Sequence, residues 1–182
     1  MSKLRPTLWR TCRVLASEIR LQLLWRIFDG EEFGVGELGR QVGISEQNAS
    51  IQLRVLNARG LITARRTKKE LYYRAEANAE VEHAGELLEM LHVCYEKKMP
   101  LKDIVWMATA FTHSRRIEIV RTLMESAQKP GDLRKMTGIA RPALGRHLRK
   151  LEARRFVRIY GDTYRLNTPK NIFGACLLGI LK

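Results

Sequence analysis

The chain has few cysteines, no long apolar run and no apolar leader, and each of these absences excludes a class of protein. Its three cysteines, Cys12, Cys94 and Cys176, are odd in number and far apart, which is not the pattern of a disulfide framework and favours a reducing compartment. The longest apolar stretch, residues 172–181, has roughly half the length that a membrane span needs. The opening segment MSKLRPTLWR lacks the apolar core of a signal peptide. The sequence therefore predicts a cytoplasmic protein without a transmembrane helix.

Signatures of catalysis are also missing from the sequence. No Gly-rich phosphate loop, no pair of catalytic carboxylates and no Ser/His/Asp arrangement stands out. We therefore expect a protein that is not an enzyme and that uses no cofactor.

Acidic residues are scarce relative to basic ones, with 19 Asp+Glu against 33 Lys+Arg and a net charge of +14 in 182 residues. Such an excess indicates a polyanionic partner, with nucleic acid first and an anionic membrane surface second. The net charge is uneven, at +6 over residues 1–78, −3 over 79–100 and +11 over 101–182. This pattern indicates two anion-facing modules joined by a segment that faces elsewhere.

The two basic segments resemble each other in sequence. Residues 36–62 (GELGRQVGISEQNASIQLRVLNARGLI) align with 131–157 (GDLRKMTGIARPALGRHLRKLEARRFV) at a constant offset of 95, with nine identities in 27 positions. Upstream, residues 20–27 match 116–123 at an offset of 96. Because glycines fall at the same loop position in both copies, an internal duplication explains the similarity better than chance resemblance of two amphipathic helices.

Each copy predicts the same series of elements. In the first, apolar residues at helical spacing end at Asp29-Gly30, a short helix covers 35–42, Gly43 stops it, and Ser45 caps a helix running to about Arg59. β-forming residues at 61–64 and 71–73 then flank the charged turn RRTKKE, which predicts a hairpin. The second copy repeats this order, with helices at 117–124, 133–137 and 142–154 and strands at 156–160 and 163–166 around a Gly161-Asp162 turn.

This order of elements predicts a winged helix-turn-helix in each copy. The fold class is therefore mainly α with small β-hairpins (α+β), as two winged helix-turn-helix domains in tandem joined by an amphipathic helix. We expect a first winged-helix domain at 1–78, a connecting or dimerisation helix at 79–100, and a second winged-helix domain with an apolar C-terminal helix at 101–182.

The segment ISEQNASIQLRVLNARGLI followed by RRTKKELYYR resembles the recognition helix and wing of ArsR-type transcriptional regulators. The residues that match the family pattern are Ser45, Ser50, Leu53, Leu56, Gly60 and Leu61. Gln52 stands at the usual histidine, which His147 restores in the second copy, whereas Arg155 replaces the glycine there. The resemblance covers about 60–65 residues in each half of the chain, and it implies a transcriptional regulator that binds double-stranded DNA.

The second helix of a helix-turn-helix enters the DNA major groove, so its outward residues are the candidate contacts. A helical wheel places Ala49, Leu53 and Leu56 on the core side of the first copy, and Leu144, Leu148 and Leu151 on that of the second. Gln47 and Asn48 suit adenine and Arg146 suits guanine, whereas Arg54, Arg149 and Lys150 suit phosphates equally well. The candidate DNA-binding residues are Gln47, Asn48, Ser50, Ile51, Arg54, Arg65, Arg66, Lys68, Lys69, Arg141, Arg146, His147, Arg149, Lys150, Arg158 and Arg165.

Two further segments bear on assembly. Residues 79–98 show apolar residues at helical spacing and an acidic outer face, so this helix dimerises the protein or packs one copy against the other as a pseudo-dimer within one chain. Thr168-Pro169 predicts the start of a helix in the apolar tail, which either closes the second domain or forms a homodimer seam. Because operator palindromes match two-fold proteins, we favour the homodimer.

The resembled family includes metal sensors, whose sites use Cys on the recognition side of the fold or Asp/His and His/Glu pairs on the helix after the wing. The chain has no C-x-C, and His83 and His92 are nine residues apart, on opposite sides of a helix that also carries Cys94; we therefore expect no metal site. Alternative functions are a scaffold of the chromosome-segregation kind and a replication or general nucleic-acid binder. A scaffold is disfavoured because both recognition faces are basic.

Overall fold

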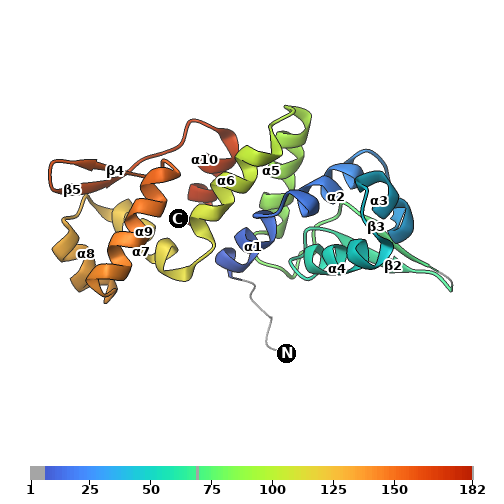
Figure 1. The fold of residues 1–182 in the computed structure, drawn as a ribbon, viewed down its shortest axis with the longest axis horizontal. Helices are drawn as coiled ribbons and strands as arrows, with labels where there is room; N and C mark the ends of the chain where they lie inside the picture. The colour runs from blue at the N-terminus through green and yellow to red at the C-terminus, as the bar shows by residue number, and fades with distance from the viewer. Residues whose placement is uncertain (1–6, 69, 182) are drawn as a thin grey trace. The chain divides into compact units, whose positions relative to one another are not determined.

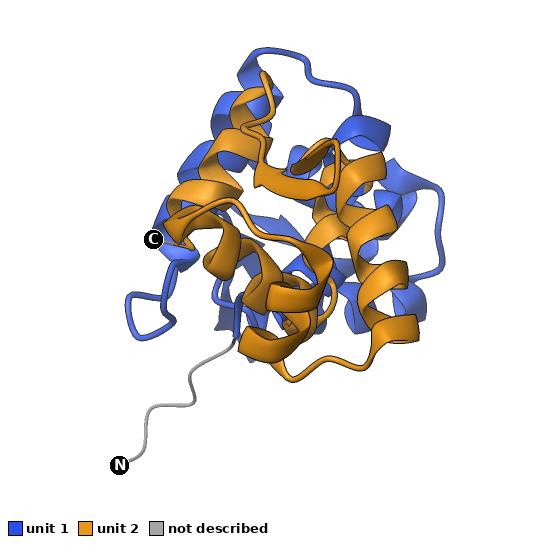
Figure 2. Ribbon diagram, turned by 90° about the vertical axis from the view of Figure 1, so that its left-hand side faces the viewer, with its two compact units in different colours: residues 1–105 blue, residues 106–182 orange. Residues whose placement is uncertain are grey.

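The structure, a computed structural model, describes residues 7–68 and 70–181 and divides the chain into two compact units, residues 1–105 and 106–182 (Figure 1, Figure 2). Helices dominate both units, and the strands form one three-stranded and one two-stranded antiparallel sheet. This confirms the predicted mainly α fold with small β-hairpins.

The first unit contains a helix-turn-helix followed by a hairpin. Its elements in chain order are α1 (Leu8–Leu15), α2 (Glu18–Phe28), β1 (Phe33–Gly34), α3 (Val35–Val42), α4 (Glu46–Asn57), β2 (Thr63–Arg66), β3 (Leu71–Arg74) and α5 (Ala84–Glu96). Helix α6 (Leu101–Ala108) runs across the boundary between the units.

The turn between α3 and α4 is built as the sequence predicts. Gly43 ends α3 in the left-handed conformation, with φ 76°, which glycine adopts without a steric penalty. The Ser45 hydroxyl then accepts a hydrogen bond of 3.2 Å from the Asn48 amide and caps α4. Helix α4 ends at Asn57, two residues earlier than predicted, and Gly60 follows with φ 68°.

The core of the first unit is formed by the apolar faces of its helices. Leu24 and Ile27 of α2 and Leu53 and Leu56 of α4 are fully buried, as the helical spacing of these residues predicts. Tyr73 of β3 is 1% exposed and packs on the same core. Strand β3 lies between β2 and β1 in the sheet, and β1 is a short strand that sequence patterning missed because it has only two residues.

The second unit contains the same succession of helices and strands. Its elements are a single 3₁₀ turn (Thr109–Phe111), α7 (Ser114–Glu125), α8 (Pro130–Thr137), α9 (Arg141–Ala153), β4 (Val157–Tyr160), β5 (Thr163–Leu166) and α10 (Ile172–Gly179). Gly138, at φ 63°, ends α8 as Gly43 ends α3. The isolated bridge between Gln128 and Tyr164 stands where β1 pairs with β3 in the first unit.

Arg155 adopts the left-handed conformation that Gly60 has in the first unit, with φ 62°. A side chain with a Cβ atom is strained there by about 1–2 kcal/mol. Local bonds hold this conformation, because the Arg155 amide donates to the Glu152 carbonyl at 2.8 Å and the Arg155 carbonyl accepts from the Asn167 side chain. The substitution of arginine for glycine therefore leaves the shape of this helix end unchanged.

Two helices begin later than the sequence predicts. Residues 79–83 form a turn anchored on Asn78, whose side chain accepts from the Glu80 amide at 2.9 Å, so α5 starts at Ala84. The tail helix α10 starts at Ile172 rather than at Thr168-Pro169, because Asn171 caps it by accepting from the Gly174 amide at 2.6 Å.

The apolar side chains of the tail are covered in the single chain. Phe173 and Leu177 of α10 are fully buried, and Leu181 just beyond it is 3% exposed. The Leu181 carbonyl also accepts a hydrogen bond from Arg121 of α7 at 3.3 Å. Among the described residues, no helix has the length and apolar character needed to span a bilayer.

Candidate nucleic-acid interface

Helix α9 presents a basic face to solvent in the second unit. Leu144, Leu148 and Leu151 are buried on its opposite side, as the helical wheel predicts. Of the candidate DNA contacts on this helix, Arg141, Arg146 and Arg149 are exposed, while His147 and Lys150 are half-buried. The exposed side of α9 therefore carries three arginines, which suit phosphate oxygens and guanine edges.

Helix α4 presents a different face in the first unit. Gln47 and Arg54 are exposed, and Ile51 keeps 45% of its surface accessible. Asn48 and Ser50 are half-buried. The exposed face of α4 thus carries one cation and the carboxylate of Glu46 among amide and apolar side chains, where α9 carries three cations.

Asn48 takes part in a hydrogen-bonded chain that sequence patterning did not reveal. Its side-chain oxygen accepts from the Gln52 amide at 3.0 Å, and the Gln52 oxygen accepts from Arg20 of α2 at 2.8 Å. This chain fixes the Asn48 amide group, so its orientation is set before any base approaches.

Arg20 and Arg116 are structural residues that helical periodicity does not reveal. Arg20 donates to the Val14 carbonyl at 2.6 Å and the Arg13 carbonyl at 3.1 Å, at the end of α1. Arg116 donates to the Ala110 carbonyl at 2.5 Å, within the 3₁₀ turn. The offset of 96 that pairs these two arginines in the sequence is the signal that could have identified them.

His147 of α9 lies against α7 rather than pointing freely into solvent. Its ring centre is 4.7 Å from that of His113, whose Nδ1 accepts from the Arg115 amide at 3.1 Å and caps α7. Burial lowers the pKa of His147 from its ordinary value of 6.5, and nearby cations lower it further, in the order His113, Arg116, Arg146 and Arg115.

This shift predicts a pH-dependent stability. Because folded His147 binds its proton less readily than an unfolded histidine, the free energy of unfolding should fall as pH drops below about 6.5. The substitution His147→Gln, which installs the residue found at Gln52, is expected to reduce the loss of Tm between pH 7.5 and 5.5. An NMR titration of the His147 ring should give a midpoint below that of free histidine, and a midpoint at or above it would contradict the prediction.

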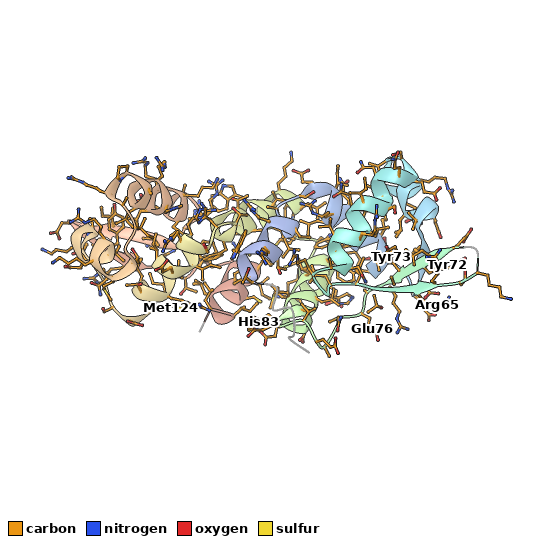
Figure 3. All side chains as sticks on the ribbon, turned by 90° about the horizontal axis from the view of Figure 1, so that it is seen from below. Arg65, Tyr72, Tyr73, Glu76, His83 and Met124 are labelled. Atoms are coloured by element: carbon orange, nitrogen blue, oxygen red, sulfur yellow. The ribbon has the colours of Figure 1, made fainter. Side chains whose placement is uncertain are left out.

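The wing of the first unit is the β2–β3 hairpin, seen at the right of Figure 3. Arg65 is bound by Glu32, through one hydrogen bond of 2.9 Å and a second, shorter one, and its guanidinium lies 5.5 Å from the Tyr72 ring centre. Arg65 lowers the pKa of Glu32, first by hydrogen bonding and then by its charge. Arg66 and Lys68 are exposed, and the candidate Lys69 lies outside the described residues.

The wing of the second unit is the shorter β4–β5 hairpin. Arg158 and Arg165 face each other directly across its two strands, and both are exposed. Like charges in such a pair repel each other. Arg165 also lies 5.2 Å from the Tyr160 ring centre. Two opposed arginines on one face of the hairpin provide a place where an anion would relieve the repulsion.

His83 stands just before α5, at its N-cap position, whereas His92 lies within the helix. His83 lies 3.4 Å from Glu86 and 3.8 Å from Glu82, and His92 lies 3.6 Å from Glu96, so the two histidines have separate partners. Within residues 7–68 and 70–181, no group of three or more His, Cys, Asp or Glu side chains is placed to hold a metal ion. Helix α5 instead packs on α2, where the Tyr95 hydroxyl donates to Asp29 and the Tyr95 ring lies 5.5 Å from that of Phe28.

Known proteins match parts of this chain. The profile of the arsR family of bacterial regulatory proteins matches residues 113–158, which are α7, α8, α9 and the start of β4. A solved structure, reduced HlyU from Vibrio cholerae, shares 23% sequence identity, with 50% of this chain and 87% of that chain covered and a TM-score of 0.41.

Curated relatives carry the name biofilm growth-associated repressor. The protein from Xylella fastidiosa is 41% identical over 68 residues, which are 37% of this chain and 59% of the relative, so the chain spans about three fifths of that protein. The protein from Agrobacterium fabrum is 36% identical over 83 residues, which are 46% of this chain and 67% of the relative. Because these matches are to regulatory proteins, they support the expectation that the chain is not an enzyme. On these matches the chain belongs to the arsR family of bacterial regulatory proteins.

Proposed function

We propose that this protein is a transcriptional regulator that binds duplex DNA and reads its sequence with helices α4 and α9. The observation that carries the proposal is that Arg141, Arg146 and Arg149 are all exposed on the second helix of a helix-turn-helix, directly before a basic hairpin. In this fold the second helix enters the major groove and the hairpin lies along the backbone or in the minor groove. Membership of a regulatory family supports the same conclusion.

The candidate residues divide by chemistry into those that suit base edges and those that suit phosphates. Arg146, Gln47 and Asn48 carry groups that suit guanine and adenine edges. Exposed cations on the strands and at the ends of the helices suit phosphates, which position the protein without reading sequence. The name of the curated relatives points to repression as the direction of regulation.

We further propose that the chain consists of two copies of one winged-helix module, residues 1–78 and 101–182, connected by the helix within 79–100. The shared order of elements and the constant sequence offset support this duplication. Such a protein would act as a homodimer, or as a pseudo-dimer within one chain, on a two-fold operator. A role on DNA would place it on the nucleoid.

The experiment that tests this function is selection of duplexes by the full chain from a pool of random sequence, followed by binding measurements at several salt concentrations. A consensus sequence is expected to emerge. If about six phosphates are contacted, affinity should fall by roughly 10³-fold between 50 mM and 200 mM salt, because binding releases counterions. No enriched sequence together with a flat salt response would count against DNA binding.

Two single variants separate base reading from backbone contact. Arg146→Ala is expected to relax the preference at one base pair by about 1–3 kcal/mol, whereas Arg158→Ala should weaken all sequences alike and lower the salt slope by about one. Equal losses on matched and mismatched duplexes for Arg146→Ala would assign this residue to the backbone instead.

A further inference from the structure

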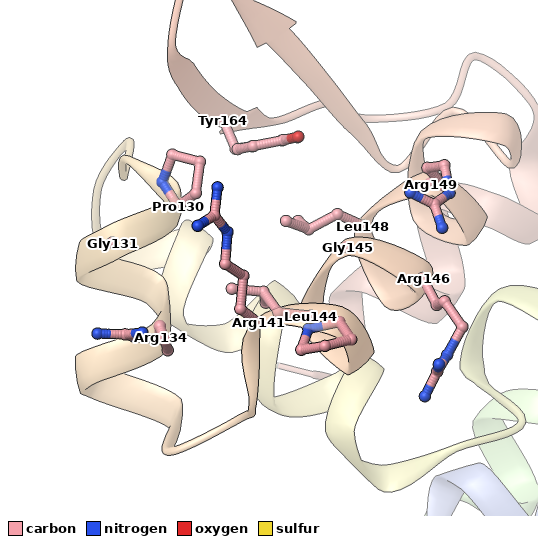
Figure 4. A pocket seen from close by; sticks show the side chains of 11 residues that line it. Pro130, Gly131, Arg134, Arg141, Leu144, Gly145, Arg146, Leu148, Arg149 and Tyr164 are labelled. Atoms are coloured by element: carbon pink, nitrogen blue, oxygen red, sulfur yellow. The ribbon is translucent and has the colours of Figure 1, made fainter.

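A basic groove of about 850 Å³ lies between α8, α9 and β5 in the second unit (Figure 4). Its polar lining comes from Arg134 of α8, from Arg141, Arg146 and Arg149 of α9, and from Tyr164 of β5. Leu148 contributes to its apolar lining. In Figure 4 the Arg141 side chain extends between the two helices toward Tyr164. Four arginines therefore line a partly apolar groove, and in Figure 4 the side chain of Arg141 extends into it.

No carboxylate lines this groove, and every lining residue belongs to the described part of the chain. The nearby carboxylates have lysine partners, since Asp162 lies 2.8 Å from Lys129 and Asp132 lies 3.8 Å from Lys135. Within residues 7–68 and 70–181, no acidic side chain is paired with any of the four arginines. Their positive charge is therefore available to an external anion.

The first unit has a groove at the corresponding place, between α3, α4 and β3, with a volume of about 490 Å³. Its charged lining consists of one cation, Arg40, and three carboxylates, Glu37, Glu46 and Glu70. Glu70 accepts a hydrogen bond of 2.7 Å from the Tyr72 hydroxyl, which raises the pKa of Tyr72. This groove is therefore acidic where that of the second unit is basic.

The difference in charge between the two grooves arises at residues that occupy equivalent positions in the two copies, 95 residues apart in the sequence. Arg141, the first residue of α9, stands where α4 begins with Glu46, and Arg146 stands where α4 has Ile51. The wings differ in available positive charge in the same direction, because Glu32 pairs with Arg65 on the wing of the first unit. The arsR family profile matches residues 113–158, within the second unit.

We propose that the groove between α8, α9 and β5 holds the phosphate backbone of duplex DNA and that the corresponding groove of the first unit does not, so that the second unit anchors the protein on DNA. The inference rests on the proposed function. It gives the two winged-helix copies of the chain unequal roles in DNA binding. The guanidinium groups of Arg134, Arg141 and Arg149 match phosphate oxygens in charge and in hydrogen-bonding geometry, while Arg146 is left to a base edge. Three carboxylates around one arginine repel a phosphate at the equivalent position.

The test compares the same charge reversal in the two grooves of the full-length protein. Arg141→Glu changes the basic groove, and Arg40→Glu is the matched control in the acidic one. Arg141 is the first residue of α9, where a carboxylate interacts favourably with the helix dipole, so this variant should remain folded. Binding is measured by fluorescence anisotropy with a labelled 30-bp duplex of random sequence, from 50 to 200 mM NaCl, and folding is checked by circular dichroism.

Arg141→Glu is expected to weaken binding at least tenfold near 100 mM salt and to lower the salt slope by about one, because a phosphate contact is replaced by repulsion. Arg40→Glu should change the affinity by less than about threefold, since only the long-range field is altered. Arg141→Lys keeps the charge and should retain most of the salt slope.

Each alternative outcome has a distinct meaning. Equal losses in Arg141→Glu and Arg40→Glu would overturn the asymmetry, and no loss in Arg141→Glu would overturn the role of the groove. If the wild-type protein binds no duplex at any salt concentration, the proposed function itself fails, and the two failures are thereby distinguished.

Discussion

Replacing Phe156 with alanine is expected to lower the free energy of unfolding of the second unit by about 3–5 kcal/mol. The Phe156 ring is fully buried, and its centre lies 4.6 Å from that of the equally buried Phe111, at an interplanar angle of 68°. The residue also joins α9 to the wing, because its amide donates to Leu151 at 3.0 Å and its carbonyl accepts from Asn167 at 2.9 Å. The cavity left by alanine would lie at this junction.

The loss should be measured by urea denaturation of the full chain and localised by hydrogen exchange. Amides within 106–181 are expected to lose more protection than those of the first unit. Phe156→Leu should lose less because it leaves a smaller cavity. Tyr160→Ala, at a side chain 53% exposed on the same hairpin, should change stability by no more than about 0.5 kcal/mol. Similar losses in Phe156→Ala and Tyr160→Ala would contradict the assignment of Phe156 to the core.

Gly60→Ala is expected to destabilise the first unit by about 2–4 kcal/mol, from two separate causes. Gly60 has φ 68°, where any Cβ atom is strained. A Cβ atom there would also lie 2.7 Å from the Cβ of Val81, a branched side chain with little freedom to move away. Thermal unfolding of the full chain measures the combined effect.

Gly43→Ala is the matched control for the backbone strain alone. Gly43 has φ 76°, and nothing lies within 4 Å of a Cβ atom built there, so about 1–2 kcal/mol should be lost. In the double variant Gly60→Ala/Val81→Gly, which removes the clashing Cβ of residue 81, the loss of stability should be smaller than the sum of the losses in the two single variants. If the two glycine variants lose equal stability and the double variant shows no recovery, contact with Val81 is not a cause.

Much of the fold could be predicted because its signals are local. Helix α3 is predicted to the residue, since Gly43 supplies the left-handed stop. The hairpin of the second unit follows from β-forming residues around Gly161-Asp162. The start of α10 was misplaced because Thr168-Pro169 has the composition of a helix start, whereas the hydrogen bond that caps the helix is made by Asn171.

The candidate interface was predictable in position but less so in chemistry. The arginines of α9 lie on the exposed face that helical periodicity assigns to them. Periodicity gives no information about partners, however, so it could not show that Glu32 binds Arg65 from 33 residues away. It also could not show that Asn48 is tied through Gln52 to Arg20.

The sequence by itself determined the helix-turn-helix pattern, the excess of positive charge and its division between two segments, because these depend on residue types and on short spacings. The tertiary structure decided which charges remain available. It brings Arg134 and Arg141 together in one groove and places Glu37, Glu46 and Glu70 in the other. The physical reason is that a cation's effect on an anionic partner depends on the side chains around it, and those neighbours come from helices and strands that only folding brings together.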